Sequence, residues 1–403
     1  MRSYPLALIL TAALCACSPS DDPKATKPPP PPAAPAPPKP VALAPPTQVT
    51  PVAGGIDPTS LAAPSESDNP TIMAINAADF TVTPPGAKSP KTAKSAKATT
   101  TKAAFDPLLV RAEALLARAR FSPGVVDGKD GTNFKHALAA YRTARGIDVD
   151  GELEANTLKA LLAETGADRP VTHAYAISAA DIAGPFAPDV GEDFVKLAAQ
   201  TEGPRFATPL EALAERFHMS QSLLTALNPD VDFKTAGANL VVVDAEPPAF
   251  QKGDVASVQI SKADASATAM NKAGEVIAFY PATVGSTDRP SPSGVHKVNG
   301  VARNPDYTYD PKKLAWGPRA AGKLTVKAGP NNPVGTVWID LNAPSYGIHG
   351  SPDPDKIGKT GSHGCVRLTN WDAEALAAGV KPGVQVAFVG IRKAAAKTSS
   401  HRV

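Results

Sequence analysis

Apolar residues recur at helical spacing in residues 107–166 and in short alternating runs after residue 251. In the first region, spacings of three and four residues predict three short helices. Their apolar members are Leu108, Ala112, Leu115 and Leu116, then Phe134, Leu138 and Tyr141, then Leu158, Leu161 and Leu162. Asp106 and Pro107 make a helix start, because aspartate caps the first turn and proline fits its first position. We therefore predict a three-helix bundle over residues 104–166.

The runs after residue 251 have the shorter period of strands. GEVIAFYPATVG, GTVWIDL and GVQVAFVG are typical of strands, and proline and glycine separate them. Helical spacing is scarce there. We therefore predict a β-rich sandwich or barrel over residues 251–393, long enough to bury its own core, ahead of a tail at 394–403.

Between these regions, residues 207–244 predict two short helices and a strand. The helices carry Leu210, Leu213 and Phe217, then Leu223, Leu224 and Leu227, and the strand is NLVVV. A strand ahead of the helices is not evident, because residues 175–200 look like an insertion. His218 is interpreted as a packing or surface residue.

Composition separates an unfolded segment from these modules. Many of the 43 prolines lie in residues 18–103, in runs such as KPPPPPAAPAPPKP that favour solvated polyproline II. We predict a disordered tether with a reach of up to about 260 Å. Its lysines are interpreted as solvated, with contact to anionic wall or lipid polymers as the alternative. The whole chain has 41 basic and 38 acidic residues, a balance that gives no support to nucleic acid as a partner.

The N-terminus has the pattern of an export signal. One basic residue precedes an apolar run that is too short to span a membrane. The run ends in LCAC, which resembles a lipobox, where cleavage precedes a cysteine that becomes diacylated. Cys17 fits best, Cys15 fits less well, and a plain secretory signal at residues 1–17 is the alternative. Ser18 then favours the inner leaflet of the outer membrane, so we expect a lipid-anchored periplasmic protein.

After such processing, Cys365 is the one cysteine left for chemistry. His349 precedes it by sixteen positions, and the SPDPDKIGKTG loop between them can double back. A cysteine beside a histidine is the minimal unit of thiol catalysis. Gly364 allows close approach of a substrate, and Arg367 shares a face with Cys365 if the segment is extended. A zinc site formed by His349, His363 and Cys365 is the alternative.

IHG followed by SHGCVRL resembles the signature of the YkuD-type L,D-transpeptidases, and PSPSGVHKV and RLTNWDAEAL extend the likeness. The resemblance implies that Cys365 is the nucleophile and His349 the general base, oriented by the carbonyl of Gly350. It also implies an oxyanion site formed by His363 and Gly364 with the Cys365 amide.

The same resemblance implies that Arg367 holds a stem-peptide carboxylate and that Ser362 shapes the loop. It implies a tetrapeptide donor, a thioester intermediate and transfer to an amine, which yields 3→3 crosslinks or related products. It implies no cofactor and no metal, and acylation by carbapenems. A carboxypeptidase or hydrolase on the same fold, and a non-catalytic wall tether, remain alternatives.

Two upstream resemblances point to the same polymer. The predicted bundle resembles the peptidoglycan-binding type 1 domain, although DGELEANTLKALL lacks the usual second glycine, and a generic three-helix bundle is the alternative. Residues 170–245 resemble a degenerate LysM, a β-α-α-β module that binds N-acetylglucosamine polymers. Peptidoglycan is therefore the expected partner of this multidomain chain.

Overall fold

The computed structural model describes residues 69–79, 104–147, 154–312, 314, 317, 318 and 322–390, all within one compact unit that spans residues 56–403. The expected signal peptide, Cys17, most of the expected tether and the expected tail lie outside the described residues. Within the described ranges, no helix is long and apolar enough to span a bilayer.

Three helices form the first folded region: α2 (Pro107–Arg118), α3 (Thr132–Arg145) and α4 (Ala155–Thr165). The Asp106 side chain accepts a hydrogen bond from the amide of Leu108 at 2.8 Å, and Gly146 ends α3 with a left-handed φ of 62°. The core contains Leu115, Leu116, Phe134, Tyr141 and Leu161. The predicted bundle is therefore present, and its buried faces are those that the spacing indicated.

A short helix, α1 (Pro70–Asn76), corrects the prediction that residues 18–103 are disordered throughout. Asn69 caps it, and Ile72 and Ile75 are buried in the same core as the bundle. A seven-residue helix is unstable by itself, so packing against α2 and β1 stabilises it. Two isoleucines three positions apart are too short a pattern to predict it.

The middle module contains a two-stranded sheet. Its strands, β1 (Thr172–Ala176) and β2 (Asn239–Val243), are antiparallel, with Thr172 opposite Val243. The helices between them are α5 (Ala179–Ala183), α6 (Phe194–Ala199), α7 (Pro209–Arg216) and α8 (Gln221–Leu227). The order β1-α7-α8-β2 is β-α-α-β, with residues 177–206 inserted after the first strand. That strand was not evident in the sequence, because THAYA does not alternate and only Thr172 is fully buried.

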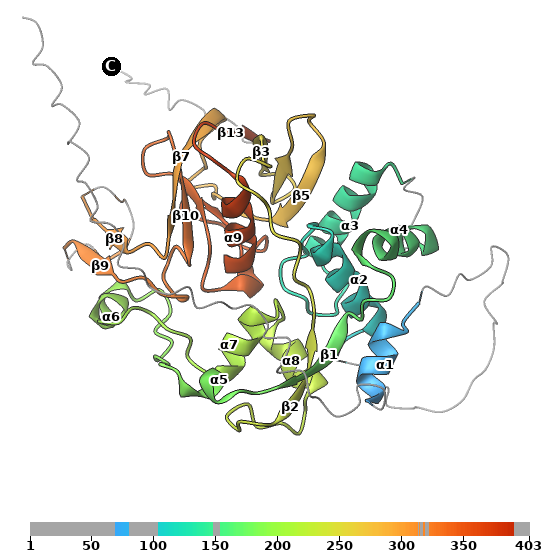
Figure 1. Ribbon diagram of the computed structural model, residues 1–403. Helices are drawn as coiled ribbons and strands as arrows, with labels where there is room; N and C mark the ends of the chain where they lie inside the picture. The colour runs from blue at the N-terminus through green and yellow to red at the C-terminus, as the bar shows by residue number, and fades with distance from the viewer. Residues whose placement is uncertain are drawn as a thin grey trace, which may run out of the picture. The chain divides into compact units, whose positions relative to one another are not determined.

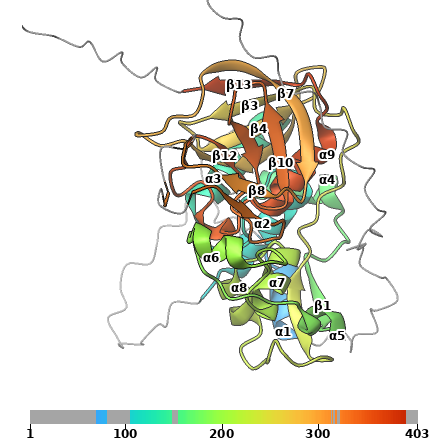
Figure 2. The same ribbon diagram turned by 90° about the vertical axis from the view of Figure 1, so that its left-hand side faces the viewer.

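The C-terminal region is built on a nine-stranded sheet in the order β5-β4-β3-β13-β7-β10-β11-β12-β6. The strands are β3 (Ser257–Ser261), β4 (Ser266–Met270), β5 (Val276–Pro281), β6 (Thr283–Val284), β7 (Gly294–Arg303), β10 (Val337–Leu341), β11 (Gly347–His349), β12 (Val366–Arg367) and β13 (Gln385–Val389). Figure 2 shows β13, β7 and β10 as neighbours. A separate hairpin pairs β8 (Tyr307–Tyr309) with β9 (Leu324–Val326).

One helix, α9 (Asn370–Gly379), packs against β10 and β11 (Figure 1). It contributes Leu376 to a core that also holds Val258, Ile260, Ile339 and Val386. A single 3₁₀ turn, η4 (Pro354–Lys356), lies between β11 and β12 in the chain. The predicted β-rich C-terminal domain is therefore confirmed.

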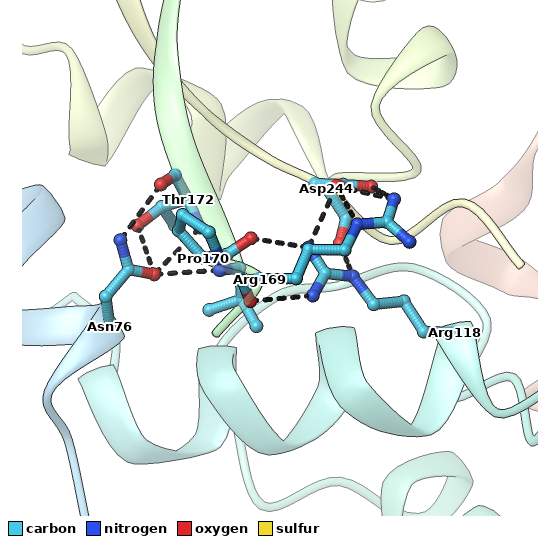
Figure 3. A network of polar contacts seen from close by, with 7 residues as sticks. Asn76, Arg118, Arg169, Pro170, Thr172 and Asp244 are labelled. Atoms are coloured by element: carbon cyan, nitrogen blue, oxygen red, sulfur yellow. Dashed lines mark hydrogen bonds and ion pairs between the residues drawn. The ribbon is translucent and has the colours of Figure 1, made fainter. Parts of the chain in front are cut away.

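Buried polar contacts join the bundle to the middle module. Arg118, whose side chain is 1% exposed, pairs with Asp244 at 2.9 Å and donates to the carbonyls of Arg169 and Pro170 (Figure 3). Arg169 also pairs with Asp244, and the Asn76 side chain bonds the backbone of Thr172. We call the cluster of Arg118, Arg169 and Asp244 the arginine seam.

Contacts of the same kind reach the β-rich domain. Ser122 donates to the Asp372 carboxyl at 2.9 Å, and the Asn133 amide donates to the carbonyl of Ile357 at 2.9 Å. Asn370, at the start of α9, donates to Glu215 of α7 at 2.7 Å. The bundle thus contacts α9 and the loop that joins His349 to the SHGC motif, and the middle module contacts α9.

Candidate active site

Three neighbouring strands place the predicted site residues on one face of the sheet. In register, Trp338 of β10 lies opposite His349 of β11, and His349 lies opposite Arg367 of β12. Ile348 and Val366, which alternate with them, point into the core, where each is 1% exposed. Cys365 lies in a bend directly before β12, and it lines the same cavity as His349 and Arg367. That alternation along an extended segment places Cys365 and Arg367 on one face stays a prediction.

This face forms the floor of a cavity of ≈ 990 Å³. Cys365, His349, His363 and Arg367 all line it, together with the SPDPDK part of the loop that follows His349. The Asn133 amide and the Thr283 hydroxyl hold this loop through the backbone of Ile357 and Gly358. The sequence prediction that the loop borders the substrate site agrees with its position on the cavity wall.

His349 is a buried imidazole with a defined tautomer. Its Nδ1 lies 2.7 Å from the carbonyl oxygen of Gly350. A carbonyl oxygen only accepts, so Nδ1 carries the proton and Nε2 keeps its lone pair. Burial lowers the pKa of His349 to about 3, and the positive charge of Arg367 contributes. The ring stacks on Trp338 with centroids 5.4 Å apart, so at neutral pH the site holds a neutral, oriented base.

The Gly350 backbone packs closely against the side chain of Asn370. A Cβ on Gly350 would lie 2.2 Å from Oδ1 of Asn370, and one on Gly335 would lie 2.0 Å from it. Asn370 therefore needs glycine on both sides. Its Oδ1 accepts from the Thr336 amide at 3.2 Å, and its Nδ2 donates to Glu215. Asn370 and Glu215 thus lie next to the glycine that orients His349, and the sequence indicated neither contact.

The Cys365 thiol is half-buried on the cavity wall. Its Sγ lies 3.6 Å from the carbonyl oxygen of Ser345, within range of a weak S–H hydrogen bond. Burial raises the pKa of Cys365, while a hydrogen bond from the Gly347 amide and the charge of Arg367 oppose that rise. The thiol is therefore protonated at neutral pH and needs a base to become a nucleophile.

The SHGC segment is fixed by its own hydrogen bonds. Ser362 is 3% exposed. Its hydroxyl donates to the Cys365 carbonyl at 2.6 Å and accepts from the Gly364 amide at 3.2 Å. The Gly364 carbonyl accepts from the hydroxyl of Ser291 at 2.7 Å. Gly364 has a φ of 113°, and a Cβ there would meet Tyr346 at 2.8 Å, so glycine is required. Ser362 holds the loop shape around the thiol.

His363 differs from His349 in its surroundings. It is exposed, and burial of part of its ring lowers its pKa, as do Arg367 and Arg289, whereas Glu192 raises it. It is not part of the register row formed by Trp338, His349 and Arg367 across β10, β11 and β12. Among the described residues, no group of three His, Cys, Asp or Glu side chains is arranged to hold a metal ion.

Several cavity residues were missed by sequence reasoning. Tyr307 lies on the wall, where burial raises its pKa, and so does its proximity to Cys365. The alternation in VWIDL predicted a strand that contains Trp338, but the sequence did not indicate which strand would pair with it. Arg205 and Gln200 also line the cavity, although they belong to the insertion in the middle module.

The family comparison agrees with this geometry. Residues 256–388 match the L,D-transpeptidase catalytic domain, named YkuD, and residues 106–161 match a putative peptidoglycan binding domain. Residues 256–388 are an L,D-transpeptidase catalytic domain. The resemblances predicted for the C-terminal region and for the helical bundle are thereby confirmed.

Relatives of the transpeptidase domain include proteins from two bacteria. A putative L,D-transpeptidase YkuD of Bacillus subtilis is 26% identical over 177 residues, which cover 44% of this chain and 91% of that protein. A probable L,D-transpeptidase YbiS of Escherichia coli is 31% identical over 189 residues, covering 45% of this chain and 60% of that protein. The chain thus spans most of the first relative and less than two thirds of the second.

A solved structure, L,D-transpeptidase 3 of Mycobacterium tuberculosis, is 16% identical. The alignment has a TM-score of 0.28 and covers 37% of this chain and 67% of that one.

Proposed function

We propose that this protein is a cysteine L,D-transpeptidase that acts on peptidoglycan stem peptides. One observation carries the proposal: a protonated thiol, a neutral imidazole and an arginine line one large cavity, with His349 opposite Arg367 in β11 and β12 and Cys365 directly before β12. This arrangement occurs within a domain that matches the L,D-transpeptidase family. The substrate is a tetrapeptide stem, because the family's donor ends in a D-amino acid that the enzyme releases.

The first half-reaction forms a thioester. Nε2 of His349 accepts the Cys365 proton, and the sulfur attacks the carbonyl carbon of the third residue. The backbone amides of His363 and Cys365, on either side of Gly364, stabilise the oxyanion, whereas the Gly364 amide is held by Ser362. The C–N bond to the terminal D-Ala then breaks, and the imidazolium returns its proton to the leaving amine.

The second half-reaction transfers the acyl group. His349 accepts a proton from the acceptor amine, whose nitrogen attacks the thioester, and the C–S bond breaks to release the thiolate. The imidazolium proton restores the thiol, and a new amide is formed. The side-chain amine of a second stem gives a 3→3 crosslink. Arg367 holds a carboxylate of the stem, because a guanidinium pairs with carboxylates in bidentate geometry.

The upstream modules bring the enzyme to its polymer. The helical bundle binds peptidoglycan, in keeping with its family match. The middle module acts as a LysM-like glycan binder, a proposal that its β-α-α-β order supports. A lipid on Cys17 and the tether predicted for residues 18–103, which α1 interrupts, hold the protein in the periplasm, at the inner leaflet of the outer membrane. Each of these assignments extends the catalytic proposal.

The test uses the purified protein with a disaccharide-tetrapeptide and analysis of the muropeptide products. We expect a 3→3 dimer and released D-Ala, and neither from Cys365→Ala. Tripeptide with no dimer would identify a hydrolase instead. Glycan binding that is unchanged in Cys365→Ala, with no turnover by the wild type, would identify a wall tether.

A carbapenem tests the thiol independently of the acceptor. Attack of Cys365 on the β-lactam carbonyl opens the ring and adds the whole drug to the protein. We expect a mass increase equal to that of the drug, absent in Cys365→Ala. A folded wild-type sample with unchanged mass would contradict a reactive thiol.

A further inference from the structure

The wall of the catalytic cavity comes from two parts of the chain. The transpeptidase domain supplies the floor, and the insertion of the middle module supplies much of the opposite wall, including Glu192, Phe194, Gln200 and Arg205. Residues 188–205 lie outside the region that matches the catalytic family. Any contact that residues 188–205 make with a ligand in the cavity is therefore an addition to those that the catalytic domain itself provides.

The insertion is fastened to the transpeptidase domain. The Phe194 ring stacks on Tyr309 at 5.3 Å between centroids, and α6 packs on β9. Further along, the backbones touch: a Cβ on Gly203 would lie 1.9 Å from the carbonyl oxygen of Ala328, and one on Gly329 would lie 2.2 Å from that of Pro204. Such close approach leaves no room for a side chain at either glycine.

The last residue of this segment is held at its backbone. The Asn331 amide group donates to the Arg205 carbonyl at 3.0 Å and to Glu211 at 2.8 Å, and the Asn331 backbone donates to Pro204 at 3.2 Å. Arg205 is therefore a fixed position on the cavity wall. Its side chain takes no part in these bonds.

One nitrogen of the Arg205 guanidinium has no hydrogen-bond partner within the described part of the protein. This nitrogen, Nε, is buried, and the Oε1 of Gln200 is likewise buried without a partner among the described residues. By contrast, the arginines of the seam and of the middle module, Arg118, Arg169 and Arg216, are all paired with aspartates. A buried donor without an acceptor is costly, so an unmatched arginine in a cavity wall indicates an anionic ligand.

We propose that Arg205 binds a carboxylate of a stem peptide in the catalytic cavity, separate from the carboxylate that Arg367 holds. This inference rests on the proposed function. Stem peptides carry a second carboxylate on the diaminopimelate side chain, and a guanidinium matches a carboxylate with two parallel hydrogen bonds. The middle module thus contributes a specificity-determining residue to the transpeptidase domain.

The experiment compares tetrapeptide stems whose diaminopimelate side-chain carboxyl is free or amidated. Binding is measured by calorimetry on Cys365→Ala, and acylation and transfer on proteins with the thiol. We expect the free carboxylate to bind about 10-fold to 100-fold more tightly than the amide, as charge-assisted hydrogen bonds predict. Arg205→Gln should abolish that preference by weakening the free acid alone, and Arg205→Lys should restore part of it.

Arg303→Ala is the matched control, because Arg303 is an exposed arginine of β7 outside the cavity wall. A preference lost in acylation places the carboxylate on the donor, and one lost only in transfer places it on the acceptor. An equal preference in wild type and Arg205→Gln, in binding and in both steps, would overturn the proposal. A wild type that binds with the preference but never acylates would refute the catalytic proposal and leave the Arg205 site standing.

Discussion

The arginine seam and the catalytic cavity treat the same side chain in opposite ways. Arg118 is buried and its guanidinium is matched by the Asp244 carboxylate and three backbone carbonyls. Arg205 is half-buried on the cavity wall, and its Nε has no partner among the described residues. The first arginine joins two modules of the chain, and the second faces a space that a ligand can enter.

The difference shows which arginine contributes to the stability of the fold and which one is available to bind a ligand. A buried charge whose hydrogen bonds are all matched holds the modules together, and removing it leaves its former partners buried without a hydrogen bond. An unmatched group stabilises nothing in the unliganded protein, so its replacement affects binding and not folding. Variants on each side of this contrast should therefore separate stability from activity.

The largest effect on activity is expected for His349→Ala. Loss of a general base lowers rates by about 10²–10⁴-fold, and here the thiol is protonated and cannot react without one. The measurement is the acylation rate of Cys365 with a tetrapeptide stem. His363→Ala is the comparison, and we expect a much smaller loss. Wild-type acylation by His349→Ala would show that the base has been assigned to the wrong histidine.

The largest effect on stability is expected for Arg118→Ala. The substitution leaves three carbonyls and part of Asp244 without their donor, and we expect a loss of about 2–4 kcal/mol in the free energy of unfolding. Denaturant titration measures it. Lys135→Ala is the control, because Lys135 pairs with Asp130 at an exposed site with side chains 59% and 60% exposed. A loss of unfolding free energy no larger than that of the control would mean that the arginine seam does not stabilise the fold.

Glu215→Gln tests a residue of the middle module that lines the catalytic cavity. Burial raises the pKa of Glu215 from its usual 4.5 to about 8, so between these values the folded state holds a proton that the unfolded chain has lost. Stability therefore falls as the pH rises through this window. Glutamine keeps the acceptor for Asn370 and cannot titrate, so the fall should be shallower by up to about 1.4 kcal/mol per pH unit.

The measurement is unfolding free energy at several pH values between 5 and 8. Burial raises the pKa of Asp372 to about 7. Asp372 therefore titrates in both proteins and gives both the same remaining dependence of unfolding free energy on pH. Superimposable curves for wild type and Glu215→Gln would argue against a protonated Glu215 behind Asn370. Unchanged acylation by Glu215→Gln at neutral pH is expected, because the hydrogen bond persists.

The smallest effect is expected for Lys356→Ala. Lys356 pairs with Asp353 at 3.2 Å on the cavity rim, but the side chains are 63% and 45% exposed. Exposed pairs contribute about 0–1 kcal/mol. We expect thermal unfolding within error of the wild type, and a shift of several degrees would show that the loop between β11 and β12 depends on this pair.

Local signals in the sequence determined the modules and the chemistry. The Asp106-Pro107 start, the helical spacing around Leu115 and the IHG and SHGCVRL motifs each act over a few residues, so they can be read without the fold. They predicted the bundle, the β-rich domain and the thiol with its histidine. The two-residue spacing of Cys365 and Arg367 also led us to expect both near one site, and both line the cavity.

Contacts between distant segments required the tertiary structure. The strand at 172–176 and the helix at 70–76 are stabilised by partners far along the chain, and Asn370 meets Glu215 across 155 positions. The placement of Arg205 opposite the transpeptidase floor depends on glycines that let two backbones touch. Spacing along a chain carries no information about such pairings, because packing selects them only when the modules meet. The residues proposed for catalysis were therefore identified from the sequence, and the cavity wall that faces them was decided by the fold.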